Sequence, residues 1–219
     1  MNIKDYREKE LKMYIISCIF LLICLTKSFE ISIEWNENIK ILANIIDTTL
    51  ISSCIYIFTY IADSIFSSRV KDNIVNLFGI IKKPGEKIFS NIKDNCKDDR
   101  ICKEKALNKY KDIYEKLPND DNQRAKYENE KWYEIYSQYR DITMIQVSNR
   151  DYLLCRDLFF STISIIILYI GTVIIKLFPL NWTFIIFLFL MLVVNNVATH
   201  LKASRLAYNV IAYDLSRKN

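Results

Sequence analysis

The sequence predicts an all-α integral membrane protein with four transmembrane helices and a helical cytoplasmic insert between spans 2 and 3. Two apolar runs, residues 158–178 and 182–194, fold back at Pro179, and the first holds a single charge, Lys176. At a rise of ~1.5 Å per residue, ~20 apolar residues cross a hydrocarbon core of ~30 Å. Charge is concentrated in residues 69–157 between two apolar blocks, which favours one water-facing insert. Because the chain has only three Gly and three Pro, long helices are expected rather than strands.

The N-terminal segment, residues 1–66, is predicted to hold the first two spans. The first apolar run, residues 13–26, is bounded by Lys12 and Lys27 and is as short as the core of a signal peptide. The leader is acidic as well as basic and no small-x-small cleavage site follows, so we expect an uncleaved helix over about residues 11–31. The second span covers residues 41–66 and is the most polar of the four.

Polar side chains within these spans have two interpretations. A polar group in hydrocarbon costs a few kcal/mol unless it is paired or hydrated, so the polar stripe of the second span could line an ion path in an oligomer. The alternative is that these groups join helices through hydrogen bonds of ~1 kcal/mol each. Asp63 is also close enough to the interface to be solvated. The candidate lining residues are Asn44, Thr48, Ser52, Thr59, Asp63, Asn195 and Asn196.

The insert, residues 67–157, is predicted to be a cytoplasmic helical domain. An amphipathic stretch at residues 70–83 is expected along the membrane surface, and Pro84-Gly85 turns the chain before short helices at residues 86–93 and 103–117. Residues 122–170 contain neither Gly nor Pro, which predicts a helix that runs directly into the third span. The transmembrane hairpin covers residues 158–198, and residues 199–219 are expected to continue as a cytoplasmic C-terminal helix.

The basic residues predict the topology. Of the 30 Lys and Arg residues, all but Lys27, Lys40 and Lys176 fall on the side of the N-terminus, the insert and the C-terminus. The positive-inside rule then places both termini and the insert in the cytoplasm of a multi-pass protein. The abundance of Ile, Lys and Asn suggests a bacterial genome, so we expect the inner membrane.

The sequence offers little for catalysis, and we expect no enzyme, no cofactor and no metal site. His200 is the sole histidine, which argues against a histidine-based metal cluster or a Ser-His-Asp triad. Neither GxxxxGK[ST] nor GxGxxG occurs, and no direct DNA binding is expected. Cys96 and Cys102 lack a usual zinc spacing, and incidental cysteines are favoured over a redox pair.

A candidate surface for a signal or partner combines aromatic and basic residues of the insert. Arg150, Asp151, Arg156 and Asp157 lie on two turns at the mouth of the third span, where Asp151 and Arg156, or Arg150 and Asp157, could form ion pairs. They fit juxtamembrane anchoring, and the alternative is that arginines here receive an anionic signal such as a nucleotide or a lipid headgroup. The candidate residues are Trp132, Tyr133, Tyr136, Tyr139, Arg140, Arg150 and Arg156.

Two short spans, a charged helical insert and two further spans resemble the four-transmembrane effector class of bacterial antiphage defence systems, including those activated by cyclic nucleotides. The resemblance covers the architecture of the whole chain and assigns no site residue. It implies an antiviral defence effector whose cytoplasmic domain senses a signal and whose spans form a homo-oligomer that permeabilises the bilayer by forming a pore. The alternatives are a non-conducting scaffold that recruits a cytoplasmic partner protein and, third, a small transporter or lipid-binding protein.

Overall fold

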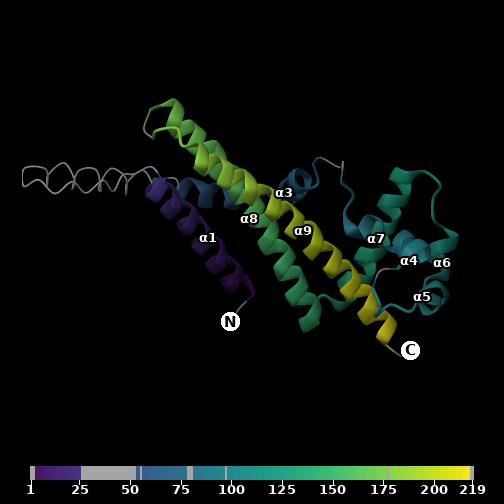
Figure 1. Cartoon of the computed structure of the whole chain (residues 1–219). Coiled ribbons are helices and arrows are strands. Elements are labelled where there is room, and N and C mark those ends of the chain that lie inside the picture. Colours follow the sequence, from purple (N-terminus) through teal and green to yellow (C-terminus); the bar gives the residue numbers. More distant parts are fainter. Residues whose placement is uncertain are drawn as a thin grey trace, which may run out of the picture. The chain divides into compact units, whose positions relative to one another are not determined.

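The computed structural model describes residues 3–25, 53–54, 56–77, 81–96, 98–176 and 178–217, with side chains from residue 6 onward. This part of the chain is 84% helical and contains no strand, which confirms the all-α class (Figure 1). Two of its helices, α8 (Thr143–Ile174) and α9 (Trp182–Ser216), are long and apolar enough to cross a membrane.

The chain folds into two compact units. The first comprises Met1–Val75 and Arg156–Asn196, and the second comprises Asn76–Cys155 and Val197–Asn219. The unit boundaries fall inside α8 and α9, so each of these helices contributes to both units.

The first unit packs α1 (Ile3–Leu25) against the apolar parts of α8 and α9. Leu11, Ile15, Cys18 and Leu22 recur at three- and four-residue steps and are buried on one face of α1. They share a core with Ile165, Tyr169, Phe184 and Leu188 of the two long helices. The helix starts eight residues earlier than the expected Leu11, because the Lys-, Arg- and Glu-rich leader consists largely of good helix formers.

The turn between α8 and α9 is fixed by polar contacts at Asn181. Its side-chain Oδ1 accepts from Phe184 N at 3.0 Å, which is the N-cap geometry for α9. Its Nδ2 donates to the Leu25 carbonyl at 2.8 Å, so the end of α1 is tied to the same turn. The Tyr169 hydroxyl accepts from Asn181 N at 2.8 Å and donates to the Pro179 carbonyl at 3.0 Å.

The first unit also contains helical residues 56–65 and α3 (Ser68–Val75). α3 covers only part of the amphipathic stretch expected at residues 70–83, and Leu77 follows it with a φ of 47°. A β-carbon disfavours that left-handed conformation, so the positive φ marks the end of the helix.

The second unit collects short helices around the C-terminal end of α9. They are η2 (Pro84–Glu86), α4 (Ile88–Asn95), α5 (Lys103–Lys109), α6 (Lys111–Glu115) and α7 (Asp121–Tyr139). Ile88, Phe89 and Ile92 of α4 form a core with Ala207 and Ile211 of α9. Asp120 caps α7 by accepting from Asn122 N at 3.2 Å and Gln123 N at 2.9 Å.

The continuous helix expected over residues 122–170 is interrupted. α7 ends at Tyr139 and α8 begins at Thr143, with a turn in which Ile142 N donates to the Tyr139 carbonyl at 3.0 Å. Asp141 and Thr143 favour helix ends over helix interiors. The turn also lets Tyr139 and Ile145 pack into one cluster with Leu206 and Val210. The link into the apolar region is therefore α8 alone.

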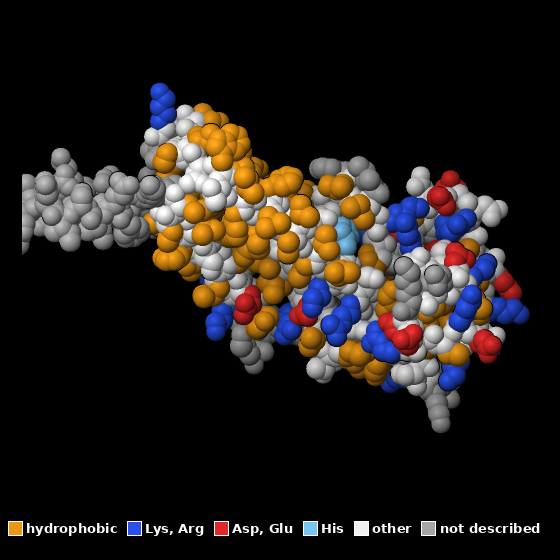
Figure 2. Space-filling view, in the orientation of Figure 1, with side chains coloured by type: hydrophobic (Ala, Val, Ile, Leu, Met, Phe, Trp, Pro, Cys, Tyr) orange, Lys and Arg blue, Asp and Glu red, His pale blue; other side chains and the backbone are white. Residues whose placement is uncertain are grey.

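Large apolar side chains remain exposed along α8 and α9. Only 22% of the most apolar stretch of α9 and 44% of that of α8 are buried, whereas the core helix of a soluble protein buries most of its surface. On α9 the exposed large apolar residues extend from Trp182 to Leu201. At 1.5 Å per residue this stretch is about 28 Å long, which is close to the ~30 Å thickness of a hydrocarbon core. Figure 2 shows the apolar side chains gathered on these helices. The two helices thus support association with a membrane.

Candidate functional site

Six charged side chains of the first unit form one ion-paired group, termed here the charge cluster. Four elements supply them: α1, helical residues 56–65, α3 and α8. The cluster brings together residues that are up to 150 positions apart in the sequence. Its members are Arg7, Asp63, Lys71, Asp72, Arg156 and Asp157.

Asp157 is the centre of the charge cluster, with a side chain that is 1% exposed. Its Oδ2 lies 3.3 Å from Arg7 Nε, and its Oδ1 lies 3.4 Å from Lys71 Nζ. Arg156 adds Nη2 at 3.1 Å and Nε at 3.3 Å to the same Oδ1. One buried carboxylate therefore pairs with three cations from three helices.

The remaining acids balance these cations. Lys71 also pairs with Asp63, and Arg156 Nη1 donates to Asp72 Oδ1 at 3.0 Å. Among the described residues, three basic and three acidic side chains thus give the cluster a formal charge of zero. Burying a charge is costly unless it is paired, and a buried network whose partners are all present is far less costly than one with a member removed.

A second Arg-Asp pair on α8 lies in a different environment. In the second unit Asp151 binds Arg150 Nη2 at 2.7 Å and Lys202 Nζ at 3.1 Å, but its side chain is 25% exposed. In both pairs the arginine binds the carboxylate next to it, and a lysine from another element completes the group. The Asp157 carboxylate is 1% exposed against 25% for Asp151, which makes its group the more consequential of the two.

The described lining candidates turn inward, toward other helices. Asn195 Nδ2 donates to the Tyr14 hydroxyl at 3.2 Å and to Thr162 Oγ1 at 3.1 Å, which joins α9, α1 and α8. Asn196 Nδ2 donates to the Val75 carbonyl at 3.1 Å. These bonds fit helix joining better than an aqueous path.

The structure describes only part of residues 41–66, where the sequence predicts the second span. Asp63 is 16% exposed and paired with Lys71 rather than solvated. Thr59 is buried, and its hydroxyl has no hydrogen-bond partner within the described chain. The candidates Asn44, Thr48 and Ser52 lie outside the described residues.

The candidate partner residues do not share one surface. Trp132 is partly buried in the core of the second unit, where its Nε1 donates to the Ala207 carbonyl at 3.3 Å. Tyr139 is buried, and Arg156 belongs to the charge cluster of the first unit. Tyr133, which is 59% exposed, and Arg140, which lies 3.9 Å from Asp141, remain accessible. Tyr136 stacks on Trp132 with ring centroids 5.3 Å apart.

A buried carboxylate that the sequence did not single out organises the second unit. Asp214 accepts from the Tyr110 hydroxyl at 2.6 Å and the Tyr139 hydroxyl at 2.8 Å, and it pairs with Lys109 at 3.0 Å. Burial, together with this carboxylate, raises the pKa of Tyr110 and of Tyr139 above the ordinary tyrosine value. Asp214 thereby ties α5 and α7 to α9. The only sequence signal was an acid on an apolar helix face.

Glu128 plays a comparable part between α7 and α4. Its fully buried carboxylate accepts from Phe89 N at 2.9 Å, from Ser90 N at 3.1 Å and from the Ser90 hydroxyl. These are donors of the first turn of α4, which otherwise lack a helical partner.

Residues suited to metal or thiol chemistry are scattered. In the described ranges no three His, Cys, Asp or Glu side chains are grouped so that they could hold a metal ion. Cys96 and Cys102 are free thiols, one partly buried and one exposed. His200 has a buried Nε2 without a hydrogen-bond partner in the described part of the chain. The described charged and polar groups form ion pairs and hydrogen bonds that join helices. No protein-family model, curated protein or solved structure matches the chain.

Proposed function

We propose that this chain is a bacterial inner-membrane effector, of the antiphage defence type, whose cytoplasmic helical part senses a signal and whose membrane helices then permeabilise the bilayer as a homo-oligomer. The observation that carries the proposal is the charge cluster. A charge-balanced group centred on a buried carboxylate ties α1 to α8, and large apolar side chains of α8 and α9 are exposed in the same unit. This arrangement suits a resting state held closed by electrostatics.

The energetics of the cluster support a two-state device. With every charge paired, the closed arrangement is stable, and separating α1 from α8 would leave Asp157 without Arg7 in a low-dielectric site. Keeping such an effector silent until it is triggered requires a difference of several kcal/mol between its two states. A buried multi-charge group is able to supply that difference.

A conducting state of this effector requires an oligomer. Asn195 and Asn196 are satisfied inside the unit, and four helices of one subunit enclose little space. A polar path therefore needs several copies and the polar stripe of the second span, including Thr48 and Ser52. α8, which runs from the charged segment into the apolar segment without a break, is the element that transmits the signal.

Ion flux tests the proposal directly. Purified full-length protein is placed in liposomes loaded with a potassium-sensitive dye, and the wild type is compared with Asp157→Asn and with Asp151→Asn as the matched control. We expect faster flux for Asp157→Asn, because it weakens the charge cluster, and wild-type flux for Asp151→Asn. Thr48→Leu in the Asp157→Asn background is expected to suppress the flux.

Absence of flux from every variant, with each protein monodisperse on size exclusion, would exclude the pore. Arg7→Ala provides a second route, because it removes a member of the charge cluster that is 33% exposed and so has less effect on folding. Flux that rises equally for Asp151→Asn and Asp157→Asn would remove the charge cluster from the mechanism.

A non-conducting scaffold is a second candidate, favoured by one observation. Tyr133 is 59% exposed and its ring lies 5.6 Å from that of Tyr136, which gives α7 an accessible aromatic pair. Exposed aromatic residues are enriched at protein interfaces. Loss of a co-purifying soluble protein on Tyr133→Ala, but not on Tyr127→Ala of the same helix, would support it.

A further inference from the structure

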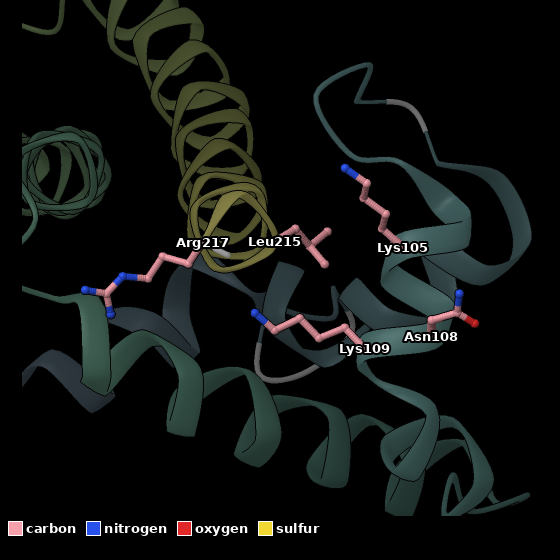
Figure 3. A pocket seen from close by; sticks show the side chains of 5 residues that line it. All are labelled: Lys105, Asn108, Lys109, Leu215 and Arg217. Carbon is pink, nitrogen blue, oxygen red and sulfur yellow. The ribbon is translucent and has the colours of Figure 1, made fainter. Parts of the chain in front are cut away.

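A basic depression lies on the second unit between α5 and the end of α9. It is a shallow depression, wide open to solvent, with a volume of about 420 Å³. No carboxylate side chain is among its described lining residues, and Figure 3 shows Lys105 and Lys109 leaving α5 on the side that faces the end of α9. The lining residues are Lys105, Asn108, Lys109, Leu215 and Arg217.

Lys109 is held in place by α9. Its Nζ donates to the Asp214 carbonyl at 2.5 Å and pairs with Asp214 Oδ1 at 3.0 Å. A cation in this position also stabilises the C-terminal end of a helix. Two tyrosine hydroxyls donate to the same carboxylate. Asp214 still carries one negative charge, which offsets the charge of Lys109 and leaves that of Lys105 uncompensated.

Lys105 has no such structural partner. Its side chain is exposed, and no hydrogen bond or ion pair holds it within the described chain. It lies four residues before Lys109 and three before Asn108, so the three share one face of α5. Arg217 differs, because Figure 3 shows its guanidinium directed away, and that group lies 5.5 Å from the centre of the Tyr139 ring.

We propose that the basic depression binds a phosphate-bearing anion, with Lys105 and Lys109 as its cations. Two ammonium groups on one face match a multiply charged anion better than a single carboxylate. Lysine binds phosphate as a compact point charge, and Leu215 offers an apolar wall beside it. The binding is independent of the proposed effector activity, whereas a signalling role for the anion rests on that activity.

Binding at this place would act on the contacts of Asp214. An anion beside Lys109 competes with Asp214 for the same ammonium, which would leave the carboxylate to Tyr110 and Tyr139. The link between α5 and α9 would then weaken. A ligand that binds one arrangement better than the other shifts the population toward it.

A titration with sodium pyrophosphate at low ionic strength tests the site. The full-length protein in a non-ionic detergent is followed by microscale thermophoresis, with Lys105→Ala as the variant and Lys103→Ala as the control. Both lysines are exposed on α5 and both changes remove one positive charge. We expect Lys105→Ala to weaken binding roughly fivefold, the upper end for an exposed ion pair, and Lys103→Ala to change it by less than about twofold.

Equal weakening of pyrophosphate binding by both variants would show an effect of general surface charge and would refute the proposed site. Absence of pyrophosphate binding by the wild type would also refute it. Two further arms distinguish the source of the phosphate. ATP binding in detergent that depends on Lys105 identifies a soluble ligand, whereas Lys105-dependent protection only in nanodiscs with phosphatidylglycerol identifies a lipid headgroup. If the protein binds pyrophosphate but no variant gives ion flux from liposomes, the proposed anion site stands and the proposed pore activity is refuted.

Discussion

Replacing Asp157 with asparagine removes one negative charge from the charge cluster with almost no change in shape. The carboxylate is 1% exposed and faces Arg7, Lys71 and Arg156 at 3.1–3.4 Å. After the change three cations share two carboxylates, Asp63 and Asp72, so one positive charge is left without compensation in a desolvated site.

Removing one partner of a buried ion pair costs about 3–5 kcal/mol. For a chain of 219 residues, each kcal/mol shifts the melting temperature by roughly 2–4 °C. We therefore expect Asp157→Asn to melt roughly 6–20 °C below the wild type, as measured by the intrinsic fluorescence of the detergent-solubilised protein.

Asp151→Asn is the matched comparison, because it also lies on α8 beside an arginine and a lysine. Its pairs are partly exposed and worth at most about 1 kcal/mol, so we expect a shift of no more than roughly 4 °C. Similar melting temperatures for the two variants would refute the reasoning, because burial would then have no influence on the cost.

Three further predictions concern the second unit. Glu128→Gln weakens the cap of α4 and should cost about 1–3 kcal/mol in chemical denaturation, whereas the exposed Glu130→Gln should change stability by less than about 0.5 kcal/mol. Burial raises the pKa of Tyr110 above 10, so above about pH 10 the native state keeps a phenol proton that the unfolded state loses. The free energy of unfolding should therefore fall as the pH rises above about 10. Tyr110→Phe should make this decrease smaller in a plot of melting temperature against pH. A β-carbon at Gly85 would lie 3.1 Å from Trp132 Cε3, and Gly85→Ala should therefore destabilise the protein by about 1–3 kcal/mol in the same denaturation assay; an unchanged midpoint would show that Trp132 can move aside.

Local patterns in the sequence predicted much of the secondary structure. The Pro179 turn, the C-terminal continuation to Ser216 and the short helices of the insert follow from breakers, apolar runs and spacing. The helix break at residues 140–142 was not predicted, because it depends on how Tyr139 and Ile145 pack against α9. A segment without Gly or Pro is predicted to be one continuous helix, because the sequence pattern does not show the tertiary contacts that favour a turn.

The candidate site was less accessible to prediction for the same reason. The two Arg-Asp pairs look equivalent in the sequence, and only their surroundings make one buried and the other partly exposed. Lys71, Asp72 and Arg7 carry no local mark of their role, since their partners come from distant helices. Asp214 was hidden likewise, because its two tyrosine donors are separated from it by 104 and 75 residues.

The zero formal charge of the charge cluster has an electrical consequence. In a membrane, moving one elementary charge through 100 mV involves ~2.3 kcal/mol, but a balanced group that moves as a whole exchanges no net work with the field. Arg7 is the one member that α1 carries. The release of α1 that we propose would carry the positive charge of Arg7 away from Asp157 and leave a net negative charge on the other five members. If the cluster lies within the membrane field, displacement of the intact cluster would be insensitive to voltage, whereas this release would respond to it.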